Sequence, residues 1–429
     1  MTSEYYLGID FGTSNSAVAL LPKGESTMFP AGKATVLPLG KNGSTTIPSY
    51  LFFPQDGRKY YLGDEAIEHY LSDNAQGRFI QSIKTLLPDT TFASTAISGW
   101  GSYTIEDIVF CMLSAIKHRL EPIIGQNIAA VVLGRPAIFS EDEDEEKIAE
   151  QRLLKAAKRA GFEHVRFQRE PIAAALTYKH SLQKPELVFV GDFGGGTSDF
   201  TVMRLSPHRI GDVGDDILAV NGVSIAGDTF NSAIMRDQLL KYFGYHARYR
   251  SLGDKWLDVP TSAHYELCEW HKIPFLKGSR WREFIGRMIH YSDDKQGFMR
   301  MQALVEENLG YSLFQSIQEA KCALSSDQTS WVKFNRSIIN IDEEITRKGF
   351  EEMIEGCIKK IGSCIDRTLA TADINDGDVD AVFLTGGTSQ TPRIHQLMGE
   401  KFGEEKLRSG NTFTSVAEGL ALSAPYLFK

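Results

Sequence analysis

The 429-residue sequence predicts a large α/β protein that contains two related strand and turn segments. The first reads GIDFGTSNS from Gly8 and the second reads GDFGGGTSD from Gly191, with Asp10 and Asp192 in matching positions. A third apolar run ends in a pair of glycines at Gly386. Segments with the apolar spacing of helices lie between these strands. Strands that alternate with helices are typical of an α/β fold.

Each glycine turn follows a short apolar run that is typical of a buried strand. The runs YYLGI and LVFVG precede the two aspartates, and the segments SAVAL and DFTVM resume strand character after the turns. Both turns are therefore expected to join antiparallel strands in β-hairpins. The third run, AVFLT from Ala381, is followed by Pro392 and by apolar residues at helical spacing, which predicts a strand that leads into a helix.

Two helices are predicted between these strands. Apolar residues at i, i+4, i+7, i+8 and i+11 from Ala149 predict an amphipathic helix that ends at Gly161. A second helix is predicted from Leu313 to Leu324 by the same criterion. Residues 244–310 mix aromatic, basic and polar side chains without a clean period, so we expect an insertion with helices whose bounds the sequence does not define.

Composition and charge exclude several classes of partner. The net charge is −9, from 46 basic and 55 acidic residues, which predicts no binding to nucleic acid or to anionic membranes. The five cysteines show no C-x-x-C spacing, which argues against a disulfide framework and a zinc site. The N-terminal MTSEYY lacks the features of a signal peptide, and no apolar stretch approaches about 20 residues. We therefore expect a cytoplasmic protein.

The glycine turns have the composition of phosphate-binding loops. A turn with glycine exposes consecutive backbone N–H groups, because no Cβ atom blocks close approach, and such concavities bind phosphate oxygens. Serine and threonine hydroxyls beside each turn can donate further hydrogen bonds. Two turns that face each other would hold a polyphosphate from both sides, which gives a physical reason for two copies. The expected phosphate-binding residues are Gly12, Thr13, Ser14, Gly194, Gly195, Gly196 and Thr197.

Three aspartates near the turns are expected to meet a metal ion. Asp10 and Asp192 end their strands just before the turns, and Asp199 would approach the same place. Hard carboxylate ligands are those that a hydrated Mg²⁺ bound to phosphates prefers. The sequence has no G-x-x-x-x-G-K-[ST] motif, which favours paired hairpin turns over a P-loop.

These segments resemble the seventy-kilodalton heat-shock chaperones, which have the actin-like ATPase fold. LGIDFGTSNSAVAL is similar to that family's first phosphate motif, VFVGDFGGGTSDFTV to its second, REPIAAALTY to its connecting helix and VDAVFLTGGTSQTPRI to its adenosine motif. The order and spacing also match, and AGDTF and EAKCALSS are similar to two further segments, so the resemblance covers nearly the whole chain.

The resemblance implies a particular architecture. It has two pseudo-symmetric lobes, each with a mixed, ribonuclease H-like sheet flanked by helices, and a nucleotide cleft between them. Lobe I is expected at residues 1–186, with an insertion at about 39–107. Lobe II is expected at residues 187–429, with an insertion at about 228–312. Because a peptide-binding domain would need on the order of 100 further residues, the sequence is similar to the short, YegD-like bacterial members without that domain.

The resemblance also implies roles for single residues, with ATP or ADP and Mg²⁺ as cofactors. Lys84 falls on the lysine that positions the attacking water and the γ-phosphate, and Glu170 falls on the acid that holds the water shell of the metal. The implied catalytic residues are Lys84, Glu170, Asp192 and Thr197. The further implied nucleotide-binding residues are Gly227, Asp228, Lys321, Ser325, Gly386, Gly387 and Thr388.

The side that would meet the nucleoside departs from the family pattern. Cys322 and Gln390 stand where the family usually stacks two arginines on the adenine, and Gln318 stands where an acid often binds the ribose. Gln318, Lys321 and Ser325 nevertheless lie at i, i+3 and i+7, so they share one face of the predicted helix. The loss of two guanidinium planes leaves the base selectivity open.

The favoured function is Mg²⁺-dependent ATP hydrolysis by a chaperone-like protein, with closure of the two lobes as a nucleotide-driven switch. One alternative is a nucleotide sensor without hydrolysis, or an assembly protein similar to actin. Another alternative is a phosphotransferase of the sugar-kinase type. The aromatic residues of the insertion offer a surface for a protein partner or the small core of the insertion itself, and these are Trp256, Trp270, Trp281 and Phe284.

Overall fold

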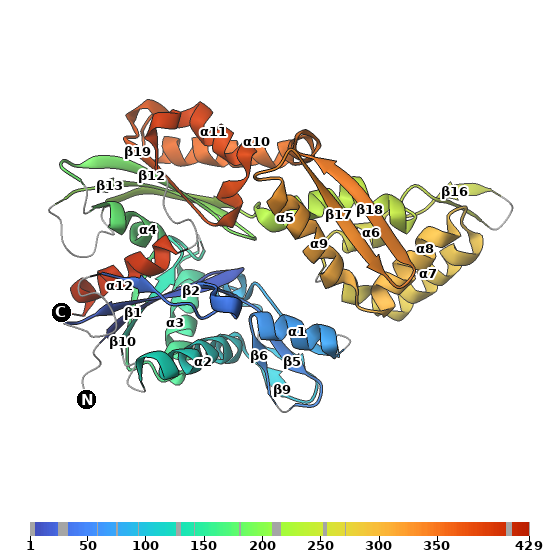
Figure 1. Ribbon diagram of the computed structural model, residues 1–429, viewed down its shortest axis with the longest axis horizontal. Helices are drawn as coiled ribbons and strands as arrows, with labels where there is room; N and C mark the ends of the chain where they lie inside the picture. The colour runs from blue at the N-terminus through green and yellow to red at the C-terminus, as the bar shows by residue number, and fades with distance from the viewer. Residues whose placement is uncertain are drawn as a thin grey trace. The chain divides into compact units, whose positions relative to one another are not determined.

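The computed structural model (Figure 1) divides the chain into two compact units, each described by itself. The first unit comprises Met1–Ala226, Ile361–Ser389 and Gln396–Lys429, and the second comprises Gly227–Lys360 and Gln390–His395. The predicted lobe boundary after residue 186 falls at the start of the second sheet and stays a prediction. The structure describes residues 5–24, 33–57, 59–73, 76–92, 94–125, 130–140, 142–179, 182–207, 216–251, 255–270, 272–408 and 414–428.

The first unit contains a mixed sheet with the strand order β11-β10-β1-β2-β3. Strands β1 and β2 are antiparallel and form the predicted hairpin, whereas β10 runs parallel to β1 and β11 runs parallel to β10. A short strand, β4, pairs with β2 beside β3. The strands of this sheet are β1 (Tyr5–Phe11), β2 (Asn15–Pro22), β3 (Thr35–Val36), β4 (Thr46–Pro48), β10 (Ala130–Arg135) and β11 (His164–Arg169).

A second sheet of the same unit has the strand order β14-β13-β12-β19-β20. Strands β12 and β13 form the second predicted hairpin, β19 runs parallel to β12, and β20 runs parallel to β19. The predicted third strand therefore exists and belongs to the same sheet as the second hairpin. The strands are β12 (Glu186–Phe193), β13 (Ser198–Leu205), β14 (Ile217–Val223), β19 (Ala381–Thr385) and β20 (Leu407–Arg408).

The two sheets have the same connectivity. When β1 is matched with β12, the hairpin partners β2 and β13 correspond, and so do the parallel neighbours β10 and β19. The outer strands correspond as well, because β3 and β14 both lie antiparallel beside the hairpin and β11 and β20 both lie parallel at the other edge. The repeated sequence motif thus lies on equivalent strands of two sheets, with Asp10 and Asp192 at equivalent positions.

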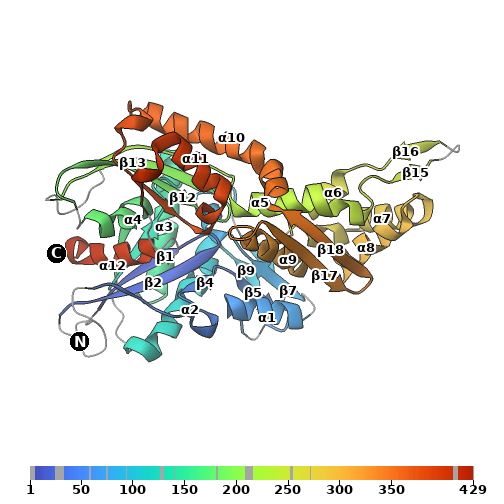
Figure 2. The ribbon, with the colours of Figure 1, turned by 45° about the horizontal axis from the view of Figure 1, so that its top comes forward.

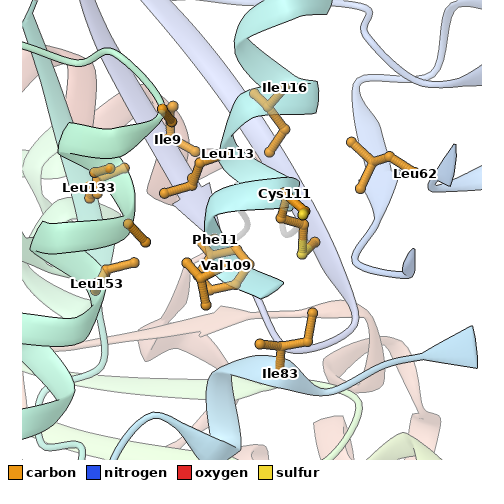
Figure 3. Close-up of a cluster of buried hydrophobic side chains, with 14 of the residues drawn as sticks. Ile9, Phe11, Leu62, Ile83, Val109, Cys111, Leu113, Ile116, Leu133 and Leu153 are labelled. Atoms are coloured by element: carbon orange, nitrogen blue, oxygen red, sulfur yellow. The ribbon is translucent and has the colours of Figure 1, made fainter. Parts of the chain in front are cut away.

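Alternation along β1 decides where Asp10 points. Ile9 and Phe11 are fully buried in a core cluster with Val109 and Leu113 of helix α2 (Ile105–Ile124), and Figure 3 shows these side chains together. Because successive side chains of a strand point to opposite faces, Asp10 lies on the face turned away from α2. Helix α2 begins with a capping box between Thr104 and Asp107, which fixes its first turn.

Helix α12 (Ser415–Leu427) covers the other face of the first sheet. A Cβ atom placed on Gly8 would lie 2.4 Å from the backbone nitrogen of Ala421 in α12, so strand and helix backbones touch here. Another cluster joins α4 and α12 to both sheets, with Val132 of β10 and Val190 of β12 among its members. The two sheets of the first unit thus share a continuous apolar core.

The remaining elements of the first unit surround these sheets. The amphipathic helix predicted to end at Gly161 is α3, which ends at Arg159, and Gly161 has a φ of 88°. The other helices that lie wholly or partly in this unit are α1 (Asp64–Ser72), α2 (Ile105–Ile124), α3 (Glu143–Arg159), α4 (Glu170–Lys179), α10 (Arg347–Thr371), α11 (Pro392–Phe402) and α12 (Ser415–Leu427). The small elements are η1 (Lys41–Gly43), β5 (Leu51–Pro54), β6 (Tyr61–Leu62), β7 (Gly77–Ile80), η2 (Ile83–Leu86), β8 (Thr95–Ile97), β9 (Gly101–Tyr103), η7 (Asp376–Asp378), η8 (Gly387–Gln390) and η9 (Glu404–Lys406).

The second unit is largely helical and carries two hairpins, as Figure 2 shows. The expectation that residues 244–310 contain helices is confirmed, and the second predicted helix is α9. The elements are α5 (Gly227–Ile234), η4 (Met235–Leu239), η5 (Leu240–Phe243), β15 (Arg248–Arg250), β16 (Trp256–Asp258), α6 (Ser262–Leu267), η6 (Ile273–Lys277), α7 (Ser279–Tyr291), α8 (Lys295–Glu306), α9 (Gly310–Ala323), β17 (Thr329–Arg336) and β18 (Ile339–Thr346).

The aromatic residues of the insertion differ in exposure. Trp256 on β16 is about half exposed, whereas Trp270 packs edge-on against Tyr311.

Within the described ranges, no helix has the length and apolar character that crossing a membrane requires.

Candidate functional site

The two hairpin loops of the first unit have equal length. Phe11 pairs with Ser16 across the first loop, and Phe193 pairs with Ser198 across the second. The second loop is closed by a hydrogen bond of 2.9 Å from the Gly194 N–H to the carbonyl oxygen of Thr197. The first loop is tighter still, because a Cβ atom on Gly12 would lie 2.2 Å from the carbonyl oxygen of Asn15.

The loops lie next to each other. A Cβ atom placed on Gly196 would be 3.7 Å from the methyl carbon of Thr13, which is ordinary van der Waals contact. In the second loop, Gly194, Gly195 and Thr197 are each partly exposed. The predicted phosphate-binding residues of both hairpins are therefore brought together in one unit.

The third glycine turn supports the second loop. Gly386 has a φ of 77°, and a Cβ atom there would lie 2.1 Å from the carbonyl oxygen of Phe193, so only glycine fits. The hydroxyl of Thr388 donates a hydrogen bond of 2.7 Å to the carbonyl oxygen of Gly194. Thr388 is buried and Gly387 is exposed. The structure thus gives Thr388 a contact that the sequence did not predict.

Lys84 lies in the short 3₁₀ helix η2 and is almost fully buried, with 8% of its surface exposed. The preceding Ser82 adopts a left-handed φ of 54°, and the neighbouring Ile83 is anchored in the core cluster shown in Figure 3. The Lys84 ammonium forms an ion pair with Glu170, the first residue of α4, which is equally buried. A Cβ atom on Gly134 would lie 3.0 Å from the Glu170 carboxylate, so the glycine makes room for it.

The aspartates are held by different partners. Asp192 and Asp199 are paired across β12 and β13. Asp192 accepts a hydrogen bond of 2.9 Å from the Thr385 hydroxyl, and Asp199 accepts one of 2.9 Å from the Thr197 hydroxyl. Asp10 accepts no side-chain hydrogen bond from any residue that the structure describes.

The electrostatics of this cluster are dominated by negative charge. Burial, and then the charge of Glu170, raise the pKa of Asp10 well above its usual range. Burial also raises the pKa of Asp192 and of Glu170, and burial together with the charge of Asp192 raises the pKa of Asp199 to about 7. Burial alone would lower the pKa of Lys84, but the carboxylates, Glu170 foremost, raise it. Lys84 is thus charged beside four acids that favour a further cation.

The cluster fits a hydrated cation better than a directly bound one. In the part of the chain that the structure describes, no group of three or more acidic, histidine or cysteine side chains has a geometry that could hold a metal ion. Mg²⁺ usually keeps several of its waters and binds through one or two carboxylates and substrate phosphates. The four buried carboxylates outnumber the Lys84 ammonium beside them, so a cation bound through its waters would balance their charge.

The predicted residues of the second unit form a separate network. The Lys321 ammonium donates a hydrogen bond of 2.9 Å to the carbonyl oxygen of Gly227 at the start of α5, and burial lowers the pKa of Lys321. The amide of Asn231 donates to Gln318, which in turn donates to the sulfur of Cys322. Ser325 is half-buried. Asp228, Cys322 and Gln390 are exposed.

Sequence reasoning did not find two residues of the cluster. Thr385 ends the apolar run AVFLT, and a hydroxyl at the end of a buried strand is a detectable signal, but its partner depends on which strand lies next to it. Gly134 is the residue before the last in the buried strand β10, and its role appears only when the Glu170 carboxylate is seen against it.

The chain matches the model of a known protein family. The family model of the Hsp70 protein matches residues 81–246 and 295–428, which is more than half of the chain. The chain therefore belongs to the Hsp70 family. Members of this family have the actin-like ATPase fold, so the predicted fold class is confirmed. Residues 247–294, in the aromatic insertion, lie outside the match.

The chain is also similar to curated relatives over its whole length. Chaperone protein DnaK from two strains of Halobacterium salinarum is 24% identical over 434 residues, which cover 100% of this chain and 56% of each relative. Chaperone protein DnaK from Elusimicrobium minutum is 24% identical over 430 residues, which cover 98% of this chain and 57% of the relative. The chain thus spans about half the length of these curated relatives.

Proposed function

We propose that the chain binds Mg²⁺-ATP with its two hairpin loops and hydrolyses it to ADP and phosphate, as the nucleotide-driven switch of a chaperone-like protein. The observation that carries the proposal is the pair of equal glycine loops, adjoining at Thr13 and Gly196, with buried acids and Lys84 in the same unit. The chaperone part is supported by the family and by the name of the DnaK relatives.

The loops would bind the phosphates. Backbone N–H groups of Gly12 to Ser14 and of Gly195 and Gly196 are the donors that the two glycine turns offer, since the Gly194 N–H already donates to the Thr197 carbonyl oxygen. The hydroxyls of Thr13 and Thr197 can add to them. Thr197 donates a hydrogen bond to Asp199, so on nucleotide binding it would exchange this partner for a phosphate oxygen. Asp10, Asp192 and Asp199 would hold the water shell of Mg²⁺, which when bound neutralises charge on the phosphates.

The side chains around the loops would position the reaction. A water molecule attacks the γ-phosphorus, the bond from that phosphorus to the bridging oxygen breaks, and ADP leaves with the electron pair of that bond. Phosphoryl transfer needs mainly alignment and charge stabilisation, so no covalent intermediate on the protein is required. Lys84, held in place by Glu170, supplies positive charge to the transferring group, and Glu170 accepts hydrogen bonds from water.

The helices α4 and α12 are the proposed pivot for closure of the two sheets. A Cβ atom on Gly419 of α12 would lie 1.8 Å from the carbonyl oxygen of Ala173 in α4, so the helix backbones touch at this point. Both helices belong to the core cluster that the two sheets share. A small rotation about one close contact is the kind of motion that lobe closure uses.

The proposed nucleoside contacts remain Lys321, Ser325, Gly386, Gly387 and Thr388, together with Gly227 and Asp228. The exposed Cys322 and Gln390 offer no guanidinium plane for stacking. We therefore expect weaker discrimination between adenine and other bases than two stacked arginines would give.

Phosphate release from Mg²⁺-ATP, measured with no acceptor present, tests the proposal. We expect slow release by the wild type and a decrease of about 100-fold in both Lys84→Ala and Thr197→Ala, because each loses a group that stabilises the transferring phosphoryl. Lys348→Ala, which changes an exposed lysine of the second unit, is the matched control and should release phosphate like the wild type.

Equal and negligible release by all four proteins would contradict hydrolysis. Binding of nucleotide without release would then identify a sensor, and release of ADP only when a sugar is added would identify a phosphotransferase. An increase of light scattering on addition of ATP would identify an assembly protein.

A further inference from the structure

We infer that Thr385 is a positioning residue that fixes the carboxylate of Asp192 for the metal-bound nucleotide. The inference rests on the proposed function and names one more residue of the same site. Thr385 lies within the segment that resembles the adenosine motif, but neither the motif nor the sequence pattern assigned it a role.

The contact between Thr385 and Asp192 is built into the sheet. Thr385 is the last residue of β19 and lies directly beside Asp192 in the parallel pair of β19 and β12. Its hydroxyl donates a hydrogen bond of 2.9 Å to Oδ1 of Asp192. Thr385 is 5% exposed, so water competes little for this hydroxyl. The other four residues of β19 are Ala381, Val382, Phe383 and Leu384, and all are buried and apolar.

A buried hydroxyl in this position is not needed for packing. Valine has the same shape as threonine and suits a buried strand equally well. A hydroxyl placed at the end of an apolar strand is stabilised only if it finds a partner, and here its partner is the carboxylate. The hydrogen bond occupies Oδ1 of Asp192, which directs the second carboxylate oxygen toward other partners.

The first sheet provides the contrast. Ile9 pairs with Leu133, so Asp10 and Gly134 are the next residues of their strands and occupy the places of Asp192 and Thr385. Gly134 has no side chain, and the Glu170 carboxylate lies in the space that a side chain would fill. The equivalent position therefore orients the aspartate of one sheet and admits the Glu170–Lys84 pair in the other.

Loss of the hydroxyl should free Asp192 to rotate among neighbouring negative charges. The positive charge of Lys84 favours the charged form of Asp192. The negative charge of Asp192 in turn raises the pKa values of Asp10, Asp199 and Glu170. A misplaced carboxylate would hold the water shell of the metal poorly. Misplacement of a positioned group commonly lowers a rate by one to two orders of magnitude.

The test compares Thr385→Val, which removes only the hydroxyl, with Thr385→Ser, which keeps it. Two quantities are measured for each protein, namely phosphate release at saturating ATP and the Mg²⁺ concentration that half-saturates the enhancement of ADP binding in calorimetry. We expect Thr385→Val to lower release about tenfold and to raise the required Mg²⁺ concentration severalfold. Thr385→Ser should stay within about twofold of the wild type in both quantities.

The control is Thr201→Val, which makes the same change at another buried threonine of the same sheet and should leave both quantities unchanged. A Thr385→Val protein that matches the wild type in its Mg²⁺ requirement overturns the inference. So does a Thr385→Val protein that binds ADP more weakly than the wild type by the same factor with and without Mg²⁺, since that result indicates a structural role. A wild type that shows no Mg²⁺-dependent ADP binding would overturn the proposed function itself and this inference with it.

Discussion

The two sheets of the first unit have the same connectivity and hairpin loops of the same length, but they carry different chemistry. In the first sheet, Asp10 accepts a hydrogen bond from none of the side chains that the structure describes, and it lies near the buried Glu170–Lys84 pair. In the second sheet, Asp192 and Asp199 are each fixed by a threonine hydroxyl. The duplicated architecture thus accounts for two loops, whereas the difference between the sheets resides in single side chains at equivalent positions.

The largest expected effect comes from the packing behind the first aspartate. Gly8 occupies the position that Val190 has in the second sheet. A Cβ atom added to Gly8 would lie 2.4 Å from the backbone nitrogen of Ala421 in α12, whereas the second sheet holds a full valine side chain at this position. Gly8→Val should destabilise the fold by more than about 4 kcal/mol, because neither backbone can yield. The reverse change, Val190→Gly, leaves a cavity in the shared core and should cost about 3 kcal/mol.

Urea unfolding of the two variants measures this difference. If Gly8→Val were as stable as the wild type, α12 would not lie against β1 as described. Similar stabilities of the two variants would indicate that the sheets are packed alike.

The next effect concerns the two aspartates themselves. Burial and the charge of Glu170 both disfavour the charged form of Asp10. Because Asp10→Asn replaces this carboxylate with a neutral amide, the melting temperature of the protein without added nucleotide should rise by a few degrees. Asp192→Asn should raise it less, because Thr385 and Lys84 already favour the charged form of Asp192. Both variants should release phosphate at least about tenfold more slowly than the wild type.

Thermal melts and phosphate release on the same preparations check these expectations. Equal increases in melting temperature would show that the two aspartates have equivalent surroundings. An unchanged release rate in either variant would remove that aspartate from the site.

The sequence predicted those helices, strands and turns that depend only on residues close together in the chain. Both hairpins, the strand before Gly386 and the helix from Ala149 follow from local periodicity and glycine turns, and all four are present. Lys84 came only through the resemblance, since it lies in a short 3₁₀ helix after the left-handed Ser82, for which the sequence carries no periodic signal.

Other features depend on contacts between distant segments. Thr385 and Asp192 are 193 residues apart in the chain, and only the parallel pairing of β19 with β12 brings them together. Helix α7 has a buried pair, Ile285 and Met288, at helical spacing, but the partly exposed Trp281 and Phe284 and the intervening Gly286 hide the period. Local patterns therefore define the elements, whereas the partners of buried polar groups depend on the tertiary pairing.

A further difference between the sheets is the pH dependence that Asp199 adds to the second sheet, where the first sheet has Ala17 in the equivalent place. The pKa of Asp199 is about 7 in the folded chain, whereas an unfolded aspartate titrates near a pKa of about 4. Between these values the folded state keeps a proton that the unfolded state releases. The contribution of Asp199 to stability is therefore full below about pH 4, falls as the pH rises, and is lost above about pH 7.

Urea midpoints of the nucleotide-free protein at pH 5, 6 and 7 measure this slope. Asp199→Asn should flatten it, and the remainder should come from Asp10, Asp192 and Glu170, whose pKa values are raised as well. Asp342→Asn, at an exposed aspartate of the second unit, is the control that should leave the slope unchanged. An identical slope in Asp199→Asn would mean that its carboxylate is already charged at pH 5.

The most direct test of the central claim is a crystal structure of the chain with Mg²⁺, ADP and phosphate. The account predicts phosphate density within hydrogen-bond distance of backbone N–H groups from both loops, Gly12–Ser14 and Gly195–Thr197, with the metal separated from the Asp10 and Asp192 carboxylates by water. Nucleotide bound to one loop alone, or at a place away from both, would contradict the claim that the two copies act together on one polyphosphate.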